Sequence, residues 1–133
     1  MSRVHFHKEP VLMPNAKGRK FMLDEPFICM VGAQCVTIPE GFWTDLASIP
    51  PVFRSVISPL DKHLKAAILH DYLYYMQRIS IFKLNRKEVD VIFLNGMVTC
   101  NVGWLKRKTM YYAVRSFGWL PWNKYKNNKK KLK

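Results

Sequence analysis

Apolar and polar positions alternate over much of the first 58 residues, and prolines and glycines separate the alternating runs. Gly32-Ala33 lies between two of these runs and favours a two-residue hairpin turn. Alternation of this kind is typical of β-strands, which it predicts over residues 4–7, 20–23, 27–31 and 34–38. We therefore expect the N-terminal part of the chain to form a small antiparallel sheet.

From residue 58 onward the apolar residues instead recur every three or four positions, which is the spacing of an amphipathic helix. The first helix is expected to begin near Ser58 as its N-cap, with Pro59 in its first turn, and to end near Met76. One face of this helix carries His63, Ala67, His70 and Tyr74.

Two further helices are predicted after a loop of about eight residues. One covers about residues 86–101, where Asn85 and Glu88 form a variant of the capping-box pattern. The other covers about residues 104–117 and ends at Gly118. The pattern thus predicts an α+β fold in which three helices follow the small antiparallel sheet.

The short loop between the first two helices favours their antiparallel packing, which could place His70 opposite Asp90. A carboxylate that holds one nitrogen of a histidine fixes its tautomer, and the other nitrogen can then take a proton from water. Asp90 has a structural alternative, because Arg86 lies one turn earlier on the same helix and could pair with it. The His–Asp pair is therefore either a catalytic base with its orienting group or a link between two helices.

Further candidate residues surround this pair. Asp71 points away from it and could bind a hard cation through oxygen. The stretch 41–51 is either a rigid corner or the rim of the His70 site, where Asp45 could contact a metal or the histidine. Supporting roles are expected for Thr44, Ser48 and Tyr74. Together these groups would suffice for hydrolysis by an activated water.

Composition and charge change the prediction only at the C-terminus. The chain has 133 residues, 49% of them hydrophobic, which indicates one folded domain. Of its 22 Lys and Arg residues, ten lie in residues 104–133, which contain no acid. We expect a globular domain over residues 1–123 and a basic tail over residues 124–133, which either is solvated or contacts a partner.

The basic residues predict contacts with anionic partners. The candidate partners are the phosphate groups of DNA, an anionic membrane surface or an acidic protein. The residues that could contact them are Lys106, Arg107, Lys108, Lys129, Lys130 and Lys131. No apolar run is long enough to predict a transmembrane segment, and the N-terminus does not resemble a signal peptide. Three cysteines without a metal-binding spacing are typical of a protein with reduced thiols.

The order His70-Asp71-x-x-Tyr74, followed by a second helix with Asp90 and Phe93, resembles the paired helices of the secreted phospholipases of the A-two type. The bacterial and viral-capsid forms are the most similar, over about residues 59–101. The resemblance implies that His70 is the general base, that Asp71 binds calcium and that Asp90 orients the histidine. The Gly-rich calcium loop of that family is missing from residues 52–58.

Three motifs spread along the chain resemble a second family, of small uncharacterised bacteriophage proteins. They are GFxTDxASIP at residues 41–50, HDxxY at 70–74 and MYxAVRxFG at 110–118. This resemblance implies a protein that is made in the host cytoplasm and packaged in the virion with other virion proteins. Two functions follow: a hydrolase of a lipid or envelope ester, or a non-enzymatic structural or assembly component. The sequence leaves open whether the protein is an enzyme.

Overall fold

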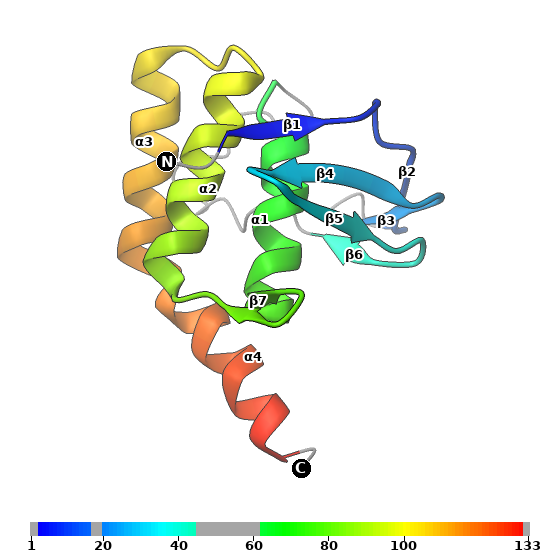
Figure 1. The fold of residues 1–133 in the computed structure, drawn as a ribbon, viewed down its shortest axis with the longest axis vertical. Coiled ribbons are helices and arrows are strands. Elements are labelled where there is room, and N and C mark those ends of the chain that lie inside the picture. The colour runs from blue at the N-terminus through cyan, green and yellow to red at the C-terminus, as the bar shows by residue number, and fades with distance from the viewer. Residues whose placement is uncertain (1–2, 17–19, 45–61, 132–133) are drawn as a thin grey trace.

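The computed structural model describes residues 3–16, 20–44 and 62–131 (Figure 1). Three predicted residues, Asp45, Ser48 and Ser58, lie outside the described residues. The side chains of Lys129, Lys130 and Lys131 are also outside the described part.

The strands of the described residues form three small antiparallel sheets, in the orders β1-β4-β5, β2-β3-β6 and β7-β8. Their bounds are β1 Val4–Phe6, β2 Leu12–Pro14, β3 Phe21–Leu23, β4 Phe27–Val31, β5 Gln34–Ile38, β6 Trp43–Thr44, β7 Arg78–Ile79 and β8 Phe82–Lys83. The last two form a hairpin inside the segment predicted as a loop.

The predicted hairpin is present: Val31 of β4 pairs with Gln34 of β5, and Gly32 between them has a φ of 60°. Alternate residues of β4 are buried, so one face of this sheet packs on the core. Cys29 is buried while Cys35 is exposed, and both are free thiols. The two cysteines thus lie on opposite faces of the hairpin.

Four helices follow in the described part of the chain, one more than predicted. They are α1 Leu64–Met76, α2 Arg86–Thr99, α3 Trp104–Phe117 and α4 Trp119–Lys131. The α+β class is confirmed: antiparallel sheets come first and the helices after them. In Figure 1 the helices α1, α2 and α3 stand side by side, with the strands packed on the α1 side.

Helix α1 begins later than predicted, because Lys62 and His63 form a turn and Leu64 is the first helical residue. The N-cap is His63, which makes no capping hydrogen bond through its side chain. The predicted capping box of α2 is confirmed. The side chain of Asn85 accepts a hydrogen bond from the Glu88 amide at 2.8 Å, and Glu88 accepts one from the Asn85 amide at 3.0 Å.

The two helices that carry the candidate site pack closely. A Cβ on Gly96 of α2 would lie 3.0 Å from the Ala66 Cβ of α1, so small residues on both helices bring their backbones together. Helix α1 lies between α2 and strand β6, and α2 also contacts β1. The middle of α1 is therefore surrounded on several sides and forms the centre of the core.

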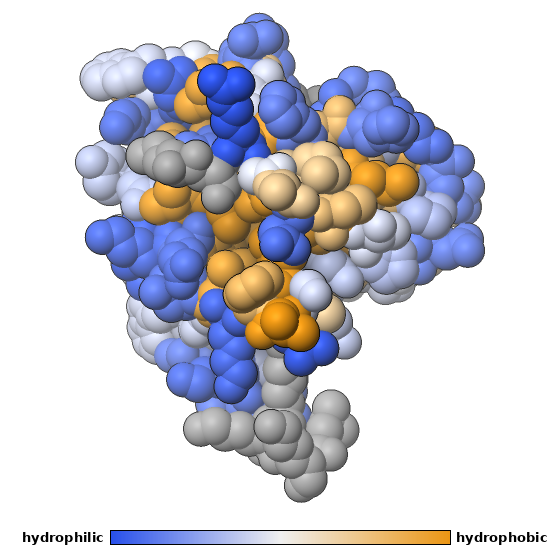
Figure 2. Space-filling view, viewed as in Figure 1, coloured by the Kyte–Doolittle hydropathy of each residue, from blue (hydrophilic) through white to orange (hydrophobic). Residues whose placement is uncertain are grey.

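Helix α3 has the predicted length, and its buried face is narrow. Met110 and Val114 are buried, whereas Trp104 and Phe117 are 64% and 57% exposed. Only α2 and α4 pack extensively on α3 in the described residues, which leaves much of its surface uncovered. Figure 2 shows apolar residues gathered at the centre of one face of the molecule, with hydrophilic residues around them.

Candidate active site

The Asp90 carboxylate is the centre of the site, and it accepts hydrogen bonds on both oxygens. His70 Nε2 lies 2.8 Å and the Tyr74 hydroxyl 2.6 Å from Oδ1. Arg115 Nη1 lies 2.8 Å and Arg86 Nη1 3.4 Å from Oδ2. Asp90 is fully buried, so its charge is compensated by these donors instead of by water.

The contacts of Asp90 determine its protonation. Burial raises the pKa of Asp90, but the hydrogen bonds donated by His70, Tyr74 and Arg115 outweigh burial and leave the pKa below its ordinary value. Burial and the hydrogen bond to Asp90 raise the pKa of Tyr74. At neutral pH the aspartate is therefore ionised, and the tyrosine is a neutral donor to it.

An ionised carboxylate can only accept, so Nε2 of His70 carries the hydrogen in this pair. In the neutral imidazole the lone pair is then on Nδ1. Nδ1 is buried and has no hydrogen-bond partner among the described residues. The ring is also packed against aromatic rings, with centroids 4.2 Å from Tyr74 and 4.6 Å from Phe93. These contacts fix both the tautomer and the orientation of the imidazole.

Two arginines connect the site to helix α3. Arg86 Nη1 donates to the backbone carbonyls of Val114 at 3.0 Å and Arg115 at 3.2 Å, near the C-terminus of α3, where a cation is favourable. Gly118 makes room for this arrangement, because a Cβ there would lie 2.4 Å from the Tyr74 hydroxyl and 3.2 Å from Arg86 Nη1. Both alternatives for Asp90, the histidine and Arg86, are thus observed together.

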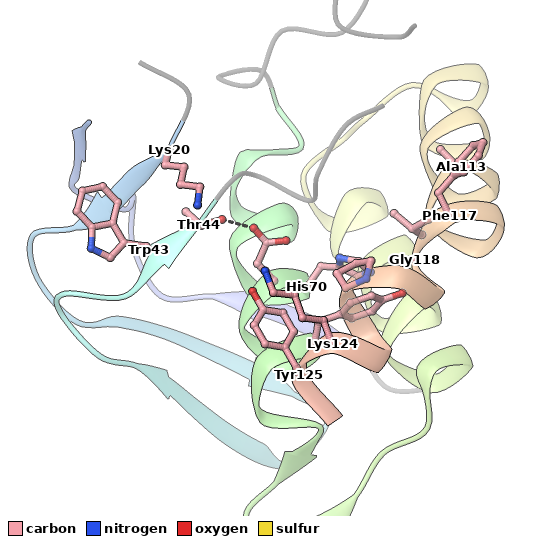
Figure 3. A pocket seen from close by; sticks show the side chains of 13 residues that line it. Lys20, Trp43, Thr44, His70, Ala113, Phe117, Gly118, Lys124 and Tyr125 are labelled. Atoms are coloured by element: carbon pink, nitrogen blue, oxygen red, sulfur yellow. Dashed lines mark hydrogen bonds between the residues drawn. The ribbon is translucent and has the colours of Figure 1, made fainter. Parts of the chain in front are cut away.

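A cavity of about 300 Å³ opens beside His70 (Figure 3). Besides His70, Asp71 and Tyr74 of α1, its walls include Thr44 of β6 and residues of α3 and α4. The predicted supporting residue Thr44 donates a hydrogen bond through its hydroxyl to Asp71 Oδ2, drawn as a dashed line in Figure 3. Asp71 therefore faces the same cavity as His70, from the adjacent position on the helix.

The structure describes only one of the two predicted metal ligands. Asp71 lines the cavity, while its predicted partner Asp45 lies outside the described residues. Within residues 3–16, 20–44 and 62–131, no group of three or more His, Cys, Asp or Glu side chains is placed to hold a metal ion. Calcium binding stays a prediction.

Of the predicted basic contacts, Lys106, Arg107 and Lys108 are not among the residues that line this cavity. Lys106 and Lys108 are half-buried on α3, and Arg107 Nη1 donates to the Val102 carbonyl at 3.2 Å, next to the start of the helix. None of the helices in the described part of the chain is long and apolar enough to cross a membrane.

The described site contains residues that the sequence did not predict. Arg115, which was not among the predicted site residues, is one of the two arginines that contact Asp90. Trp43, Lys20 and Tyr125 line the cavity from distant parts of the chain. For Arg115 a signal existed, because it directly follows the buried Val114 and could reach inward along the apolar face. The other three are brought together only by tertiary packing.

Comparisons with known proteins place the chain in a family. Residues 21–114 match the family model described as "Protein of unknown function (DUF1353)". The chain belongs to the DUF1353 family. Its DUF1353 segment runs from strand β3 to Val114 and contains His70, Asp71, Tyr74, Arg86 and Asp90. The α4 wall of the cavity lies beyond the matched segment.

A relative of this DUF1353 chain is "Uncharacterized protein y4jT" of Sinorhizobium fredii (strain NBRC 101917 / NGR234), which is 35% identical over 83 residues. These residues make up 61% of this chain and 23% of the relative, so the chain matches about a quarter of that protein. No solved structure was found to match the chain.

Proposed function

We propose that this DUF1353 protein is a hydrolase of lipid or cell-envelope esters, with His70 as the general base. The observation that carries the proposal is the state of the His70 ring. Asp90 holds Nε2 at 2.8 Å, and Nδ1 is left without a partner among the described residues, in a side chain that lines a cavity. A buried polar atom without a partner is costly, and the place of His70 in a cavity wall allows a water or ligand to complete its hydrogen bonding.

The proposed reaction needs one base and one orienting carboxylate. Nδ1 of His70 takes a proton from a water molecule in the cavity while the water oxygen attacks the ester carbonyl carbon. The resulting imidazolium is stabilised by ionised Asp90. Hydrogen bonds donated by Tyr74 and Arg115 keep this carboxylate ionised. When the carbonyl re-forms, the alcohol departs and takes the proton from Nδ1. The products are an acid and an alcohol, and His70 returns to its neutral form.

The proposal also includes a calcium ion bound beside His70. The Asp71 carboxylate lies next to His70 in the cavity wall, and carboxylate oxygens are preferred calcium ligands. Bound calcium would polarise the ester carbonyl. Asp71 would hold the ion, with Asp45 as a second ligand, and Thr44 would orient the Asp71 carboxylate through their hydrogen bond.

The test is the release of fatty acid from vesicles of mixed phosphatidylcholine and phosphatidylglycerol, with calcium and with EDTA. We expect His70→Gln to lower the rate by about 10²–10⁴-fold, the usual contribution of a general base. His63→Gln is the matched control, because His63 is buried at the N-cap of the same helix but is not part of the cavity wall. No release by folded wild-type protein in either condition would overturn the phospholipid substrate. Equal release by His70→Gln would overturn the assigned base.

A second candidate is a non-enzymatic virion or assembly component, made in the host cytoplasm and packaged with other virion proteins. The double arginine contact of Asp90 favours it, because Arg86 and Arg115 join α2 to α3 as a structural network would. This candidate predicts that folded wild-type protein releases no fatty acid, while His70→Gln lowers the free energy of unfolding by about 1–3 kcal/mol, the cost of an unsatisfied buried group. The vesicle assay distinguishes the candidates, because both predict that loss of the buried contact to Asp90 destabilises the protein.

A further inference from the structure

The cavity beside His70 has an uneven charge. Two lysines from distant parts of the chain, Lys20 before β3 and Lys124 on α4, line it together. In Figure 3, Lys20 extends toward Thr44 from the sheet side, and Lys124 lies on the α4 side. The acidic group among the described lining residues is Asp71, which accepts a hydrogen bond from Thr44.

The charges behind the wall add to this imbalance. Asp90 contributes one negative charge, whereas Arg86 and Arg115, which contact it, contribute two positive charges. With Lys20, Lys124 and Asp71 included, this group has four cations against two carboxylates. A concave site lined by charges of one sign raises the local concentration of ligands of the opposite sign. The cavity therefore favours an anion.

The remaining wall is mostly apolar and aromatic. It includes Trp43, Tyr74, Phe117, Pro121 and Tyr125. Rings of this size can contact a hydrocarbon chain or a flat apolar body, and a few polar groups then fix its orientation. A small inorganic anion alone would leave these apolar surfaces uncovered.

We propose that the cavity binds an anionic amphiphile, a molecule with a phosphate or carboxylate group next to an apolar chain. Lys20 and Lys124 contact the anion, and the aromatic wall contacts the chain. This inference rests on the proposed function in one respect: it names the substrate class that the His70 site would take. Lys20 and Lys124 are then specificity-determining residues, one on each side of His70.

The experiment measures binding without catalysis. Hexyl phosphate is titrated into the full chain while tryptophan fluorescence is followed, since Trp43 lines the cavity. Hexanol and inorganic phosphate are titrated in parallel. We expect hexyl phosphate to bind more tightly than either, and each of Lys20→Gln and Lys124→Gln to weaken its binding by about tenfold, the usual contribution of one charged hydrogen bond.

The matched control is the double variant Lys83→Gln/Lys87→Gln, which removes the same charge from exposed lysines that do not line this cavity. It should bind hexyl phosphate as wild type does. Binding is measured without turnover, so wild-type protein that binds hexyl phosphate but releases no fatty acid separates a failure of the hydrolase proposal from a failure of this one. Equal binding of hexyl phosphate by wild type and Lys20→Gln/Lys124→Gln would overturn the proposal, as would equal affinities for hexyl phosphate and inorganic phosphate.

Vesicles distinguish the two sources of such a ligand. Co-sedimentation with phosphatidylglycerol vesicles that is lost in Lys20→Gln/Lys124→Gln would identify the headgroup of a membrane lipid. Lysine-dependent binding of hexyl phosphate without any lysine-dependent binding of vesicles would identify a soluble amphiphile. Either result supports the class of ligand, and wild-type protein that binds neither probe contradicts it.

Discussion

Two buried histidines, His70 in helix α1 and His63 at its N-cap, show how surroundings decide the role of one residue type. His70 has a carboxylate partner, and its ring lines a cavity. His63 is fully buried, and neither of its ring nitrogens has a hydrogen-bond partner among the described residues. Burial lowers the pKa of His63 to about 4. His63 is therefore neutral in the folded protein at physiological pH and packs as an apolar residue.

The lowered pKa of His63 makes the stability depend on pH. The unfolded chain takes up a proton on this residue near pH 6.5, whereas the folded protein does so only near pH 4. The free energy of unfolding should thus fall as the pH is lowered from 6.5 to 4, by about 3 kcal/mol from this residue alone. Urea denaturation at several pH values measures it.

The control for this prediction is His63→Leu, which cannot titrate and should show a flatter stability profile in the same range. Asp90 does not interfere, because its pKa is lowered from 3.8 and its contribution is lost only at more acidic pH. Parallel profiles of wild type and His63→Leu between pH 6.5 and 4 would contradict the prediction.

At this scale the sequence allowed the pairing of His70 with Asp90 to be predicted, because both residues lie on helices with clear periodicity. The same periodicity placed Tyr74 on the face of His70, where it contacts Asp90. Periodicity failed for Arg115, since it assigns every charged residue of an amphipathic helix to the solvent. A buried carboxylate needs cations, and this requirement outweighed the local pattern.

Helix α4 shows the limit of prediction for a whole element. Residues 119–131 contain a proline and several asparagines and lysines, so no helix was predicted here and residues 124–133 were interpreted as a basic tail. Pro121 lies in the first turn of α4, where the missing amide costs no intrahelical hydrogen bond. The Trp122 amide donates to the Gly118 carbonyl at 3.1 Å, so hydrogen bonds continue from α3 into α4. Trp122 and Tyr125, three positions apart, pack on Tyr74 and Tyr75 of α1.

The junction between α3 and α4 predicts a large effect of one methyl group. A Cβ on Gly118 would lie 2.4 Å from both the Val114 carbonyl oxygen and the Tyr74 hydroxyl. Gly118→Ala should therefore shift α4 or displace Tyr74 from Asp90, and lower the free energy of unfolding by about 1–3 kcal/mol. Gly103→Ala is the matched control, because nothing lies within 4 Å of its Cβ, and it should stay within about 0.5 kcal/mol of wild type.

Chemical denaturation of both glycine variants is the measurement, and hexyl phosphate binding is a second readout. If Gly118→Ala displaces α4, the cavity loses its Lys124 and Tyr125 wall, and binding should weaken in proportion. Equal stability of the two variants would show that the junction is looser than its geometry indicates.

For the whole molecule, the class of fold could be predicted because strand and helix periodicities occupy separate halves of the chain. The pairing of strands within the three sheets could not be predicted, because β1 pairs with β4 and β3 with β6 across intervening strands. The clustering of basic residues near the C-terminus was visible in the sequence, and the structure adds the setting of these residues on helices α3 and α4. Beside the basic residues of α3 and α4, several large side chains are more than half exposed, namely Leu105, Tyr112, Trp119 and Leu120.

This setting predicts salt-dependent binding to polyanions that does not use the cavity. The full chain should bind short duplex DNA of random sequence, and the affinity should fall steeply between about 50 and 200 mM salt. Lys106→Gln/Lys108→Gln should reduce the slope of log affinity for DNA against log salt by about 2, because each phosphate contact releases about one counterion. Arg107 is left unchanged because it donates to the Val102 carbonyl.

The control Lys83→Gln/Lys87→Gln removes equal charge from the β7–β8 hairpin and the start of α2, and should keep the wild-type slope. If both double variants lower the slope equally, the binding reflects only net charge, and the basic helices are not a defined contact surface.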